Sequence, residues 1–380
     1  MKARQIPGAI NLAFGEPHFG PHPGARERIS SEALNWETFL STCKKYEQSR
    51  GMKALREAIA DYYARRYGMK VDPENEILIT HGGVEAINLA ALITCDPGDT
   101  ILLTDPSYML YQRALATLGR HPLALTRTPG EHEYAALEQA SKDGFPKARA
   151  ILVNSPENPT GYVMSQKDMA ALSKIAQEHN LWVIHDEVYD SMAFARRHLP
   201  ARSISGLENR TILINSFSKK YGMPGLRIGW LCGPAEAIDL AAKLHDFMYL
   251  GVNQFAETCA LQLIRDETGD RWMDETAELL ATRAQGLMNT LTPELGFEWL
   301  RSPMGAMFAF PSVTRLAKER RLTPTSNGLG DAVAHYLLGT KMIATIPGYV
   351  YGRSGQDCLR IITCSDADTF ERGLKALASL

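Results

Sequence analysis

A short stretch of the chain, residues 214–230, contains the side chains best suited to chemistry. It reads Ile-Asn-Ser-Phe-Ser-Lys-Lys-Tyr-Gly-Met-Pro-Gly-Leu-Arg-Ile-Gly-Trp and carries two hydroxyls (Ser216, Ser218), an amine (Lys219) and a guanidinium (Arg227). An amine can form a Schiff base with an aldehyde, and hydroxyls with a guanidinium can hold a phosphate. The stretch therefore suits an anionic aldehyde such as pyridoxal phosphate. By itself it is equally compatible with a basic surface turn.

A glycine-rich turn offers a second group for a phosphate. The run Glu76-Ile-Leu-Ile-Thr80 predicts a strand, and Gly82-Gly83-Val84 then open an apolar helical run that extends to Cys95. Backbone N–H groups at a helix N-terminus, with the helix dipole, favour an anion. Such turns also serve nucleotides, but the chain contains neither Gly-x-Gly-x-x-Gly nor Gly-Lys-Ser/Thr. The sequence therefore favours a phosphate site without a nucleotide fingerprint.

The pyridine ring of such a cofactor needs a carboxylate, hydrogen-bond donors and an aromatic partner. Asp186 directly follows an apolar strand and is the candidate for holding the proton on the ring nitrogen. Glu187 would point to the other side if the strand persists. Asn158 and Tyr189 could donate to the phenolic oxygen, and Tyr108 could stack on the ring. Read singly, each is also compatible with a cap, a turn or a half-buried tyrosine.

An amino-acid substrate would bring a carboxylate, for which a bidentate arginine is the fitting partner. Arg360 lies within the apolar run Cys358-Leu-Arg-Ile-Ile362. It is either an edge residue that reaches solvent or a charge kept for an anion, and we favour the anion. The Gly- and Pro-rich residues 10–23 predict an arm or loop without regular structure. Its Glu16 could line a site or be solvated.

Short apolar strands alternate with helices through the first two thirds of the chain. Strands are expected at 76–80, 101–104, 150–153, 181–184 and 211–214, with helices at 54–67, 84–95, 108–118 and 166–178. This alternation is typical of an α/β fold with a mainly parallel, doubly wound sheet, whose ligands bind beyond the carboxyl ends of the strands. The candidate residues fall at those ends.

The last third of the chain predicts a smaller α+β lobe. Helices are expected at 235–249, 254–265 and about 271–291, followed by short strands at 306–310, 341–346 and 358–363 and helices at 330–338 and 366–380. We expect a large cofactor-binding domain over residues 34–270. Residues 1–33 and 271–380 would form the N-terminal arm and the small domain.

Composition limits the partners. The 380 residues carry 41 basic and 43 acidic side chains, so the net charge of -2 creates no general attraction for nucleic acid or anionic membranes. The six cysteines are scattered without a Cys-x-x-Cys pair or a signal peptide, which predicts reduced thiols in a cytoplasmic protein. No apolar run reaches membrane-spanning length, and we expect no metal site.

Together these segments resemble the class I/II aminotransferases, the fold-type I enzymes that depend on pyridoxal phosphate. The resemblance covers nearly the whole chain in the family's order. Its motifs are Gly15-Glu-Pro17, Tyr46 with Gly51, Thr80-His-Gly-Gly83, Asn158-Pro-Thr-Gly161, Asp186-Glu-Val-Tyr189, Ser216-Phe-Ser-Lys219, Gly225-Leu-Arg-Ile-Gly229, Pro347-Gly348 and Arg360.

The resemblance implies a role for each matching residue. Lys219 would be the Schiff-base lysine, because the family's spacing favours it over the adjacent Lys220, and Asp186 would partner the ring nitrogen. The phosphate would be held by Gly83, Val84, Ser216, Ser218 and Arg227. The remaining contacts would come from Tyr189 and Asn158 at the phenolic oxygen, Tyr108 on the ring, and Arg360, Gly15, Asn158 and Glu16 around the substrate.

The implied activity is transfer of an amino group between an L-amino acid and a 2-keto acid. Tyr46 is similar to the family's tyrosine that reaches the phosphate of a neighbouring subunit, which implies a homodimer with shared sites. No arginine is assigned to a dicarboxylate side chain, so acidic substrates are not supported.

Two alternatives stay open. Lys219 to Trp230, with His245 to Leu250 and Arg360 to Cys364, also resembles the capreomycidine synthase group. That group uses the same cofactor for elimination and cyclisation of an arginine derivative, and Glu16 could then meet a guanidinium. A non-catalytic regulator on the same fold is the second alternative. It is disfavoured because both the lysine and the aspartate are present.

Overall fold

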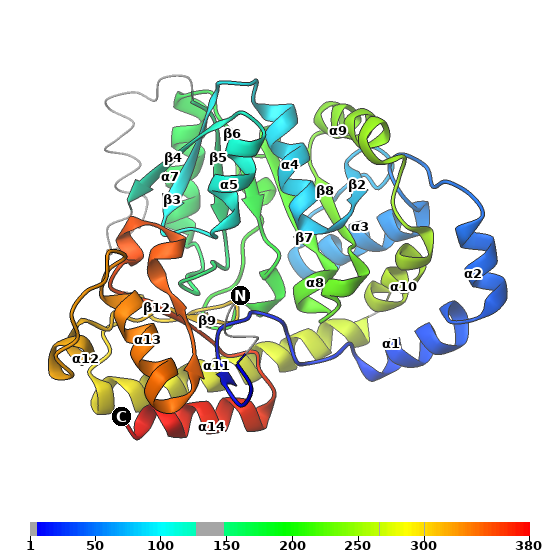
Figure 1. Ribbon diagram of the computed structural model, residues 1–380. Coiled ribbons are helices and arrows are strands. Elements are labelled where there is room, and N and C mark those ends of the chain that lie inside the picture. The colour runs from blue at the N-terminus through cyan, green and yellow to red at the C-terminus, as the bar shows by residue number, and fades with distance from the viewer. Residues whose placement is uncertain (1–5, 127–147, 266, 300) are drawn as a thin grey trace.

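A seven-stranded sheet forms the centre of the larger part of the molecule (Figure 1). The computed structural model describes residues 6–126, 148–265, 267–299 and 301–380. The strand order is β2-β8-β7-β6-β5-β3-β4. The strands are β2 (Ile77–Thr80), β3 (Thr100–Asp105), β4 (His121–Thr126), β5 (Ala148–Asn154), β6 (Trp182–Asp186), β7 (Thr211–Ser216) and β8 (Gly229–Cys232).

The sheet is mainly parallel, as the alternation of strands and helices predicts. Among the described strands of this sheet, β8 alone runs antiparallel to its two neighbours. Every residue of β2, β7 and β8 is buried, because helices cover both faces and leave no polar side to the sheet. The predicted α/β class is therefore confirmed.

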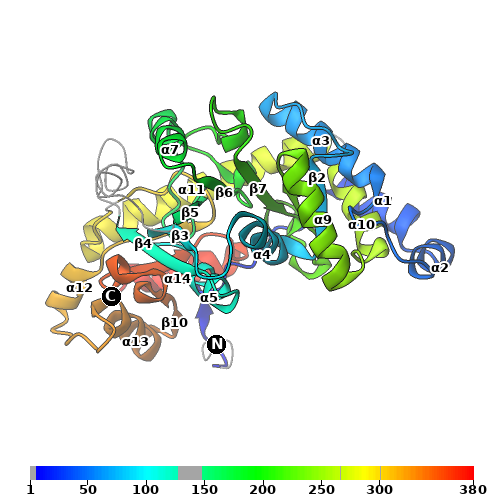
Figure 2. The same cartoon turned by 90° about the horizontal axis from the view of Figure 1, so that it is seen from above.

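Helices pack on the two faces of the sheet, as the view from above shows (Figure 2). Strand residues alternate between the faces with a period of two: Ala150 and Leu152 of β5 belong to one core cluster, and Ile151 and Val153 to the other. The first cluster includes α4 (Gly82–Thr94), α5 (Leu110–Thr117) and α9 (Ala235–Tyr249). The second includes α3 (Lys53–Tyr67), α7 (Gln166–Glu178) and α10 (Gln254–Ile264).

The smaller part has its own core around the long helix α11 (Glu267–Leu295). Its three-stranded antiparallel sheet has the order β11-β12-β9, with β9 (Phe308–Ala309), β11 (Ile346–Pro347) and β12 (Leu359–Ile362). The N-terminal strand β1 (Ile10–Asn11) pairs with β10 (Ile343–Ala344). The remaining helices are α12 (Thr314–Glu319), α13 (Leu329–Lys341) and α14 (Ala367–Ala378).

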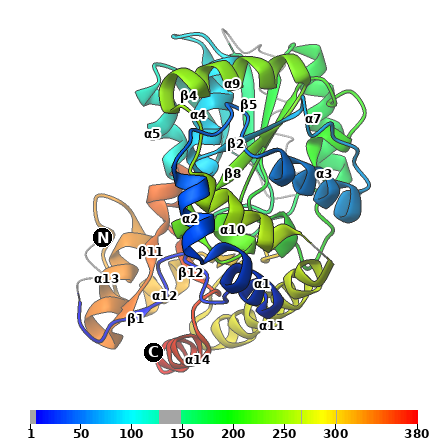
Figure 3. The ribbon, with the colours of Figure 1, turned by 90° about the vertical axis from the view of Figure 1, so that its right-hand side faces the viewer.

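The N-terminal region is more structured than the sequence predicts. The prediction of no regular structure over residues 10–23 holds for residues 12–22, but Ile10 and Asn11 form β1 and Pro23 begins α1 (Pro23–Arg28). Helix α2 (Trp36–Cys43) follows. Asn35 caps α2, because its side chain accepts a hydrogen bond from the Thr38 N–H at 2.8 Å. Figure 3 shows α2 beside α10.

The two cores support a division into two domains. We propose that residues 34–270 form the larger domain, and that residues 1–33 and 271–380 form the arm and the smaller domain. The arm connects them, since Leu12 lies in the smaller core and Ala25 in the larger one. Among the described helices, none is both long and apolar enough to cross a bilayer.

Candidate active site

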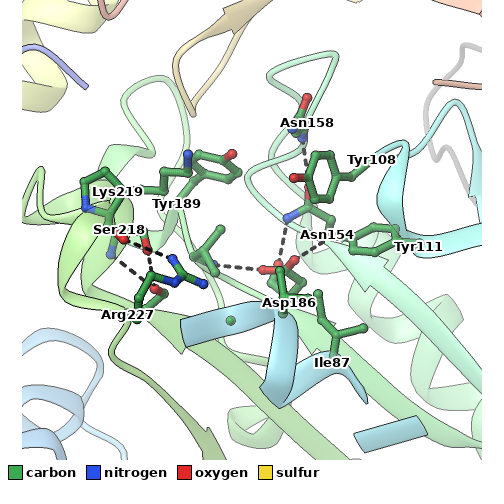
Figure 4. A pocket seen from close by; sticks show the side chains of 15 residues that line it. Ile87, Tyr108, Tyr111, Asn154, Asn158, Asp186, Tyr189, Ser218, Lys219 and Arg227 are labelled. Carbon is green, nitrogen blue, oxygen red and sulfur yellow. Dashed lines mark hydrogen bonds between the residues drawn. The ribbon is translucent and has the colours of Figure 1, made fainter. Parts of the chain in front are cut away.

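A pocket lies at the carboxyl ends of the parallel strands, where such sheets bind ligands. All predicted cofactor residues except Tyr46 line it, although they come from five separate strand ends. Its lining consists of Gly83, Val84, Ile87, Tyr108, Tyr111, Asn154, Asn158, Asp186, Val188, Tyr189, Ser216, Ser218, Lys219, Pro224 and Arg227. The residues that the sequence separates by more than a hundred positions therefore meet in one place (Figure 4).

Lys219 projects into this pocket from the short helix α8 (Phe217–Lys220). The helix begins at Ser216, whose side chain accepts a hydrogen bond from the Ser218 N–H at 3.1 Å. The Lys219 ammonium donates to the Gly15 carbonyl oxygen at 2.8 Å. Burial lowers the pKa of Lys219 below its usual value, and the nearby Arg360 charge lowers it further. A larger share of neutral amine is what a nucleophile or a general base requires.

The adjacent Lys220 points in the opposite direction. Its Nζ lies 2.5 Å from Asp190 Oδ1, and both side chains are fully buried away from the pocket lining. The two lysines therefore have different environments although they are neighbours in sequence. Lys219 is the one that faces the pocket.

Asp186 ends β6 and is almost fully buried at the pocket wall. Tyr111 donates a hydrogen bond to its Oδ2 at 2.6 Å, and the Val188 N–H donates to Oδ1 at 3.2 Å. Burial raises the pKa of Asp186 to about 6, and the Tyr111 bond opposes that rise. Glu187 points to the other side, as expected, where it accepts a hydrogen bond from Tyr63 at 2.7 Å.

Tyr111 and Asn154 are site residues that the sequence reasoning missed. Tyr111 follows Tyr108 by three positions, and in the helix expected at 108–118 that spacing places both on one face, which was the available signal. In the structure α5 (Leu110–Thr117) begins after Tyr108, and both tyrosines line the pocket. Asn154 ends β5; its amide donates to the Asp186 carbonyl at 2.8 Å, and its Oδ1 accepts from the Asn158 N–H at 2.8 Å. It therefore fixes Asn158 beside Asp186.

One end of the pocket is built for an anion. Gly83 and Val84 lie at the N-terminus of α4, where backbone N–H groups have no partner within the helix. The Ser216 and Ser218 hydroxyls are 2.9 Å apart beside them, and the Arg227 guanidinium lines the same end. The space is shaped by a glycine at position 82, with φ of 76°, because a Cβ there would lie 2.6 Å from Arg227 Nη2.

Arg360 is held just behind Asn158 by two hydrogen bonds. One nitrogen donates to Asn158 Oδ1 at 3.0 Å and the other to the Ala13 carbonyl at 2.6 Å. The guanidinium lies 4.5 Å from the ring centroid of Phe308 and 5.1 Å from that of Tyr351. Within the described residues this buried cation makes no ion pair, and its Nε has no hydrogen-bond partner. An anion from outside the chain would supply the missing charge.

Three predicted residues from the N-terminal region, Gly15, Glu16 and Tyr46, do not line the pocket. Gly15 contributes its carbonyl to Lys219, whereas Glu16 is exposed. Tyr46 is 84% exposed and does not line the pocket. Tyr108 and Tyr189 both line it, and burial raises the pKa of each phenol, so both stay neutral donors near pH 7.

Comparison with known proteins assigns the chain to a family. The family model described as "Aminotransferase class I and II" matches residues 7–377. The chain belongs to the class I and II aminotransferases.

Individual relatives agree with this assignment. The aminotransferase is 36% identical over 293 residues to "Probable N-succinyldiaminopimelate aminotransferase DapC" of Mycobacterium tuberculosis, covering 76% of this chain and 71% of the relative. It is 28% identical to the aspartate aminotransferase of Pyrococcus abyssi, covering 96% and 90%. The solved structure of N-succinyldiaminopimelate aminotransferase from Mycobacterium tuberculosis superposes with a TM-score of 0.87 at 30% identity, covering 99% of this chain and 94% of that one.

The protein is therefore an aminotransferase that uses pyridoxal 5′-phosphate. The residues present fit that cofactor. The pocket provides an amine, a buried carboxylate facing it, and an anion site of helix N–H groups, two hydroxyls and a guanidinium. These three groups match the aldehyde, the ring nitrogen and the phosphate.

Proposed function

We propose that Lys219 attaches the cofactor and moves the substrate proton, and that Asp186 holds the proton of the cofactor's ring nitrogen. The observation that carries this proposal is the shared pocket of a buried amine with a lowered pKa and a buried carboxylate. When bound, pyridoxal phosphate supplies an aldehyde for the amino group and a ring that accepts electrons.

The surrounding residues would bind and orient the other atoms. The phosphate would lie between Gly83, Val84, Ser216, Ser218 and Arg227. Tyr108 would cover a ring face, and Tyr189 with Asn158 would donate to the phenolic oxygen. Arg360 would bind the substrate carboxylate and so place the substrate Cα beside the Lys219 amine, where that amine removes and returns the Cα proton.

A substrate screen tests the reaction. Purified protein would be mixed with single amino acids, including arginine derivatives and neutral, aromatic and acidic ones, together with a keto acid. Formation of a new amino acid supports the proposal. A cyclic product from an arginine derivative, formed with no requirement for a keto acid, would contradict transfer as the main activity and favour elimination and cyclisation.

Replacing Arg360 with alanine is expected to weaken substrate binding far more than cofactor binding. Truncating one partner of a buried charge pair costs about 2–5 kcal/mol, so KM for the amino acid should rise about 30-fold or more. Cofactor affinity, measured by titration of the visible absorption band, should change little.

Arg283→Ala is the matched control for this prediction. Arg283 also belongs to the smaller part, where it donates to the Thr363 and Ser365 carbonyls at 2.7 and 2.6 Å and lies 5.0 Å from the Phe370 ring centroid. This variant should lose stability and keep its KM. Equal losses of substrate and cofactor affinity in Arg360→Ala would show that Arg360 is structural.

We also propose a homodimer in which Tyr46 reaches the partner's phosphate. Large apolar side chains are exposed around α2 and at the end of α9: Leu34, Trp36, Phe39, Tyr46, Phe247, Met248, Tyr249 and Leu250. The segment after α9 borders the phosphate turn, because His81 Nε2 lies 3.2 Å from the Gly251 carbonyl oxygen. Such a surface is typical of an interface. Sedimentation should give about twice 42.1 kDa, and a monomer would contradict the proposal.

A cytoplasmic location is part of the same proposal. All six cysteines are free thiols, and all except Cys43 are buried. Free thiols are typical of a reducing compartment.

A further inference from the structure

Four pocket residues each have one sequence neighbour that does not line the pocket. Each neighbour is polar and at most 2% exposed. Glu187 follows Asp186, Asp190 follows Tyr189, Asn215 precedes Ser216, and Lys220 follows Lys219. The chain therefore places one polar set in the pocket and a second set directly behind it.

The second set is joined through Asp190. Lys220 Nζ lies 2.5 Å from Asp190 Oδ1, and Asn215 Nδ2 donates to Asp190 Oδ2 at 3.2 Å. Tyr62 and Tyr67 of α3 donate to the same Oδ2 at 2.8 and 3.0 Å. Asp190 thus connects the end of β7, helix α8 and helix α3.

Glu187 adds two further residues, Tyr63 and His198, to this connection. Its Oε1 accepts from Tyr63 at 2.7 Å, and its Oε2 lies 3.0 Å from His198 Nε2. Asn215 Nδ2 lies 3.4 Å from Glu187 Oε1. We name Glu187, Asp190, Asn215 and Lys220, with Tyr62, Tyr63, Tyr67 and His198, the buried polar cluster.

Stability alone does not account for the ion pair at the centre of this cluster. Removing two charges from water costs about as much as their attraction returns, and an apolar pair of similar volume is often equally stable or more so. The ion pair instead fixes two segments of the chain relative to each other. Its short contact joins α8, which carries Lys219, to the segment after β6, which carries Tyr189.

We propose that Lys220 and Asp190 are positioning residues for the aminotransferase reaction. Their ion pair, supported by Tyr62, Tyr67 and Asn215, holds α8 and the ends of β6 and β7 at fixed relative positions. It thereby sets the place of the Lys219 amine relative to Asp186. The inference rests on the proposed roles of Lys219 and Asp186.

The test compares the holoenzyme with two variants, Lys220→Met and Lys220→Met/Asp190→Asn. The double variant removes both charges of the pair together, and the amide oxygen introduced by Asp190→Asn can still accept from the two tyrosines, so its Tm should return close to that of the wild type. Its kcat should stay about 10- to 100-fold low, because misplacement by about 1 Å costs up to about 100-fold. The visible circular dichroism of the bound cofactor should change, and KM should change less than kcat.

Arg202→Met is the matched control. Arg202 is also in an ion pair, partly buried, 2.8 Å from Glu76, and it contacts Cys232 Sγ at 3.3 Å. Those residues lie at the end of the strands far from the pocket, because β8 ends at Cys232 and β2 begins after Glu76. The control should lower Tm but leave kcat and the visible circular dichroism unchanged.

The outcomes distinguish a positioning role of the ion pair from a purely structural one. A double variant with wild-type kcat and circular dichroism would overturn the positioning role, and so would equal effects in Arg202→Met. If the double variant does not load cofactor, Tyr62→Phe decides, since it removes one bond to Asp190 and a 3.2 Å contact with Lys220 Nζ. It should show the same change in circular dichroism, and an unchanged spectrum and kcat would overturn the proposal. A wild-type protein without a visible cofactor band would instead contradict the proposed function.

Discussion

Lys219→Ala is expected to abolish both the visible absorption band of the bound cofactor and the transfer of amino groups. The variant loses the amine that attaches the cofactor and the general base, and a general base alone contributes about 10²- to 10⁴-fold. We therefore expect kcat to fall by at least about a thousandfold. Absorption spectra and steady-state kinetics measure the two losses, and peptide mass mapping after borohydride reduction of the wild-type holoenzyme identifies the modified lysine.

Lys220→Met is the control for this assignment. Lys220 is buried against Asp190 and cannot reach the pocket, so this variant should keep the visible band even where its kcat falls. Circular dichroism in the far ultraviolet should show that Lys219→Ala stays folded. Loss of the band in Lys220→Met with its retention in Lys219→Ala would reverse the assignment of the two lysines.

Asp186→Asn is expected to have the second largest effect. An amide of the same shape keeps the contact with Tyr111 but cannot hold a proton on the ring nitrogen by charge. Removing one preorganised electrostatic partner of this kind costs about 10²- to 10³-fold in kcat. Steady-state kinetics of the cofactor-saturated variant measure the loss.

The matched control for Asp186→Asn is Asp168→Asn. Asp168 is also fully buried and also accepts a hydrogen bond from a tyrosine, Tyr162, at 2.6 Å. As the N3 residue of α7 it completes a capping box with Ser165, and it does not line the pocket. An equal fall of kcat in both variants would show that loss of a buried carboxylate, and not its place at the ring, causes the effect.

The raised pKa of Asp186 adds a pH dependence to this prediction. In the cofactor-free protein the carboxyl is neutral below about pH 6 and ionised above it, and only the ionised form attracts a protonated ring. Cofactor affinity should therefore fall as pH decreases through about 6. Asp186→Asn should lack this component, so the difference between the two titration profiles isolates it from the ionisation of the cofactor's own phosphate. Parallel profiles would contradict the assignment.

Several elements were predictable because their residues repeat with a clear period. The helices at 166–178 and 235–249 have the expected bounds, and the apolar runs at 76–80 and 211–214 are strands. Strand β4 was missed because it lies at the sheet edge and most of its residues are partly or fully exposed, so it lacks an apolar run. Helices α1 and α2 were missed because they are short and almost no residue in them is buried.

The sequence by itself determined which chemical groups stand at the strand ends. Continuous apolar runs predict buried parallel strands, and the residue after each run then lies at the carboxyl end of its strand, on the same side of the sheet as the others. That reasoning placed Gly83, Asp186, Ser216 and Lys219 together without coordinates, and the structure brings all four to one pocket.

Only the tertiary structure decided which partners those groups have. Tyr111 meets Asp186 across 75 positions, and Lys219 meets Gly15 across 204. The opposite directions of Lys219 and Lys220 likewise depend on Asp190 and Tyr62 from other elements. Local periodicity defines the face on which a side chain lies, whereas hydrogen-bond partners and pKa shifts arise from contacts between segments far apart in the chain, which no local pattern encodes.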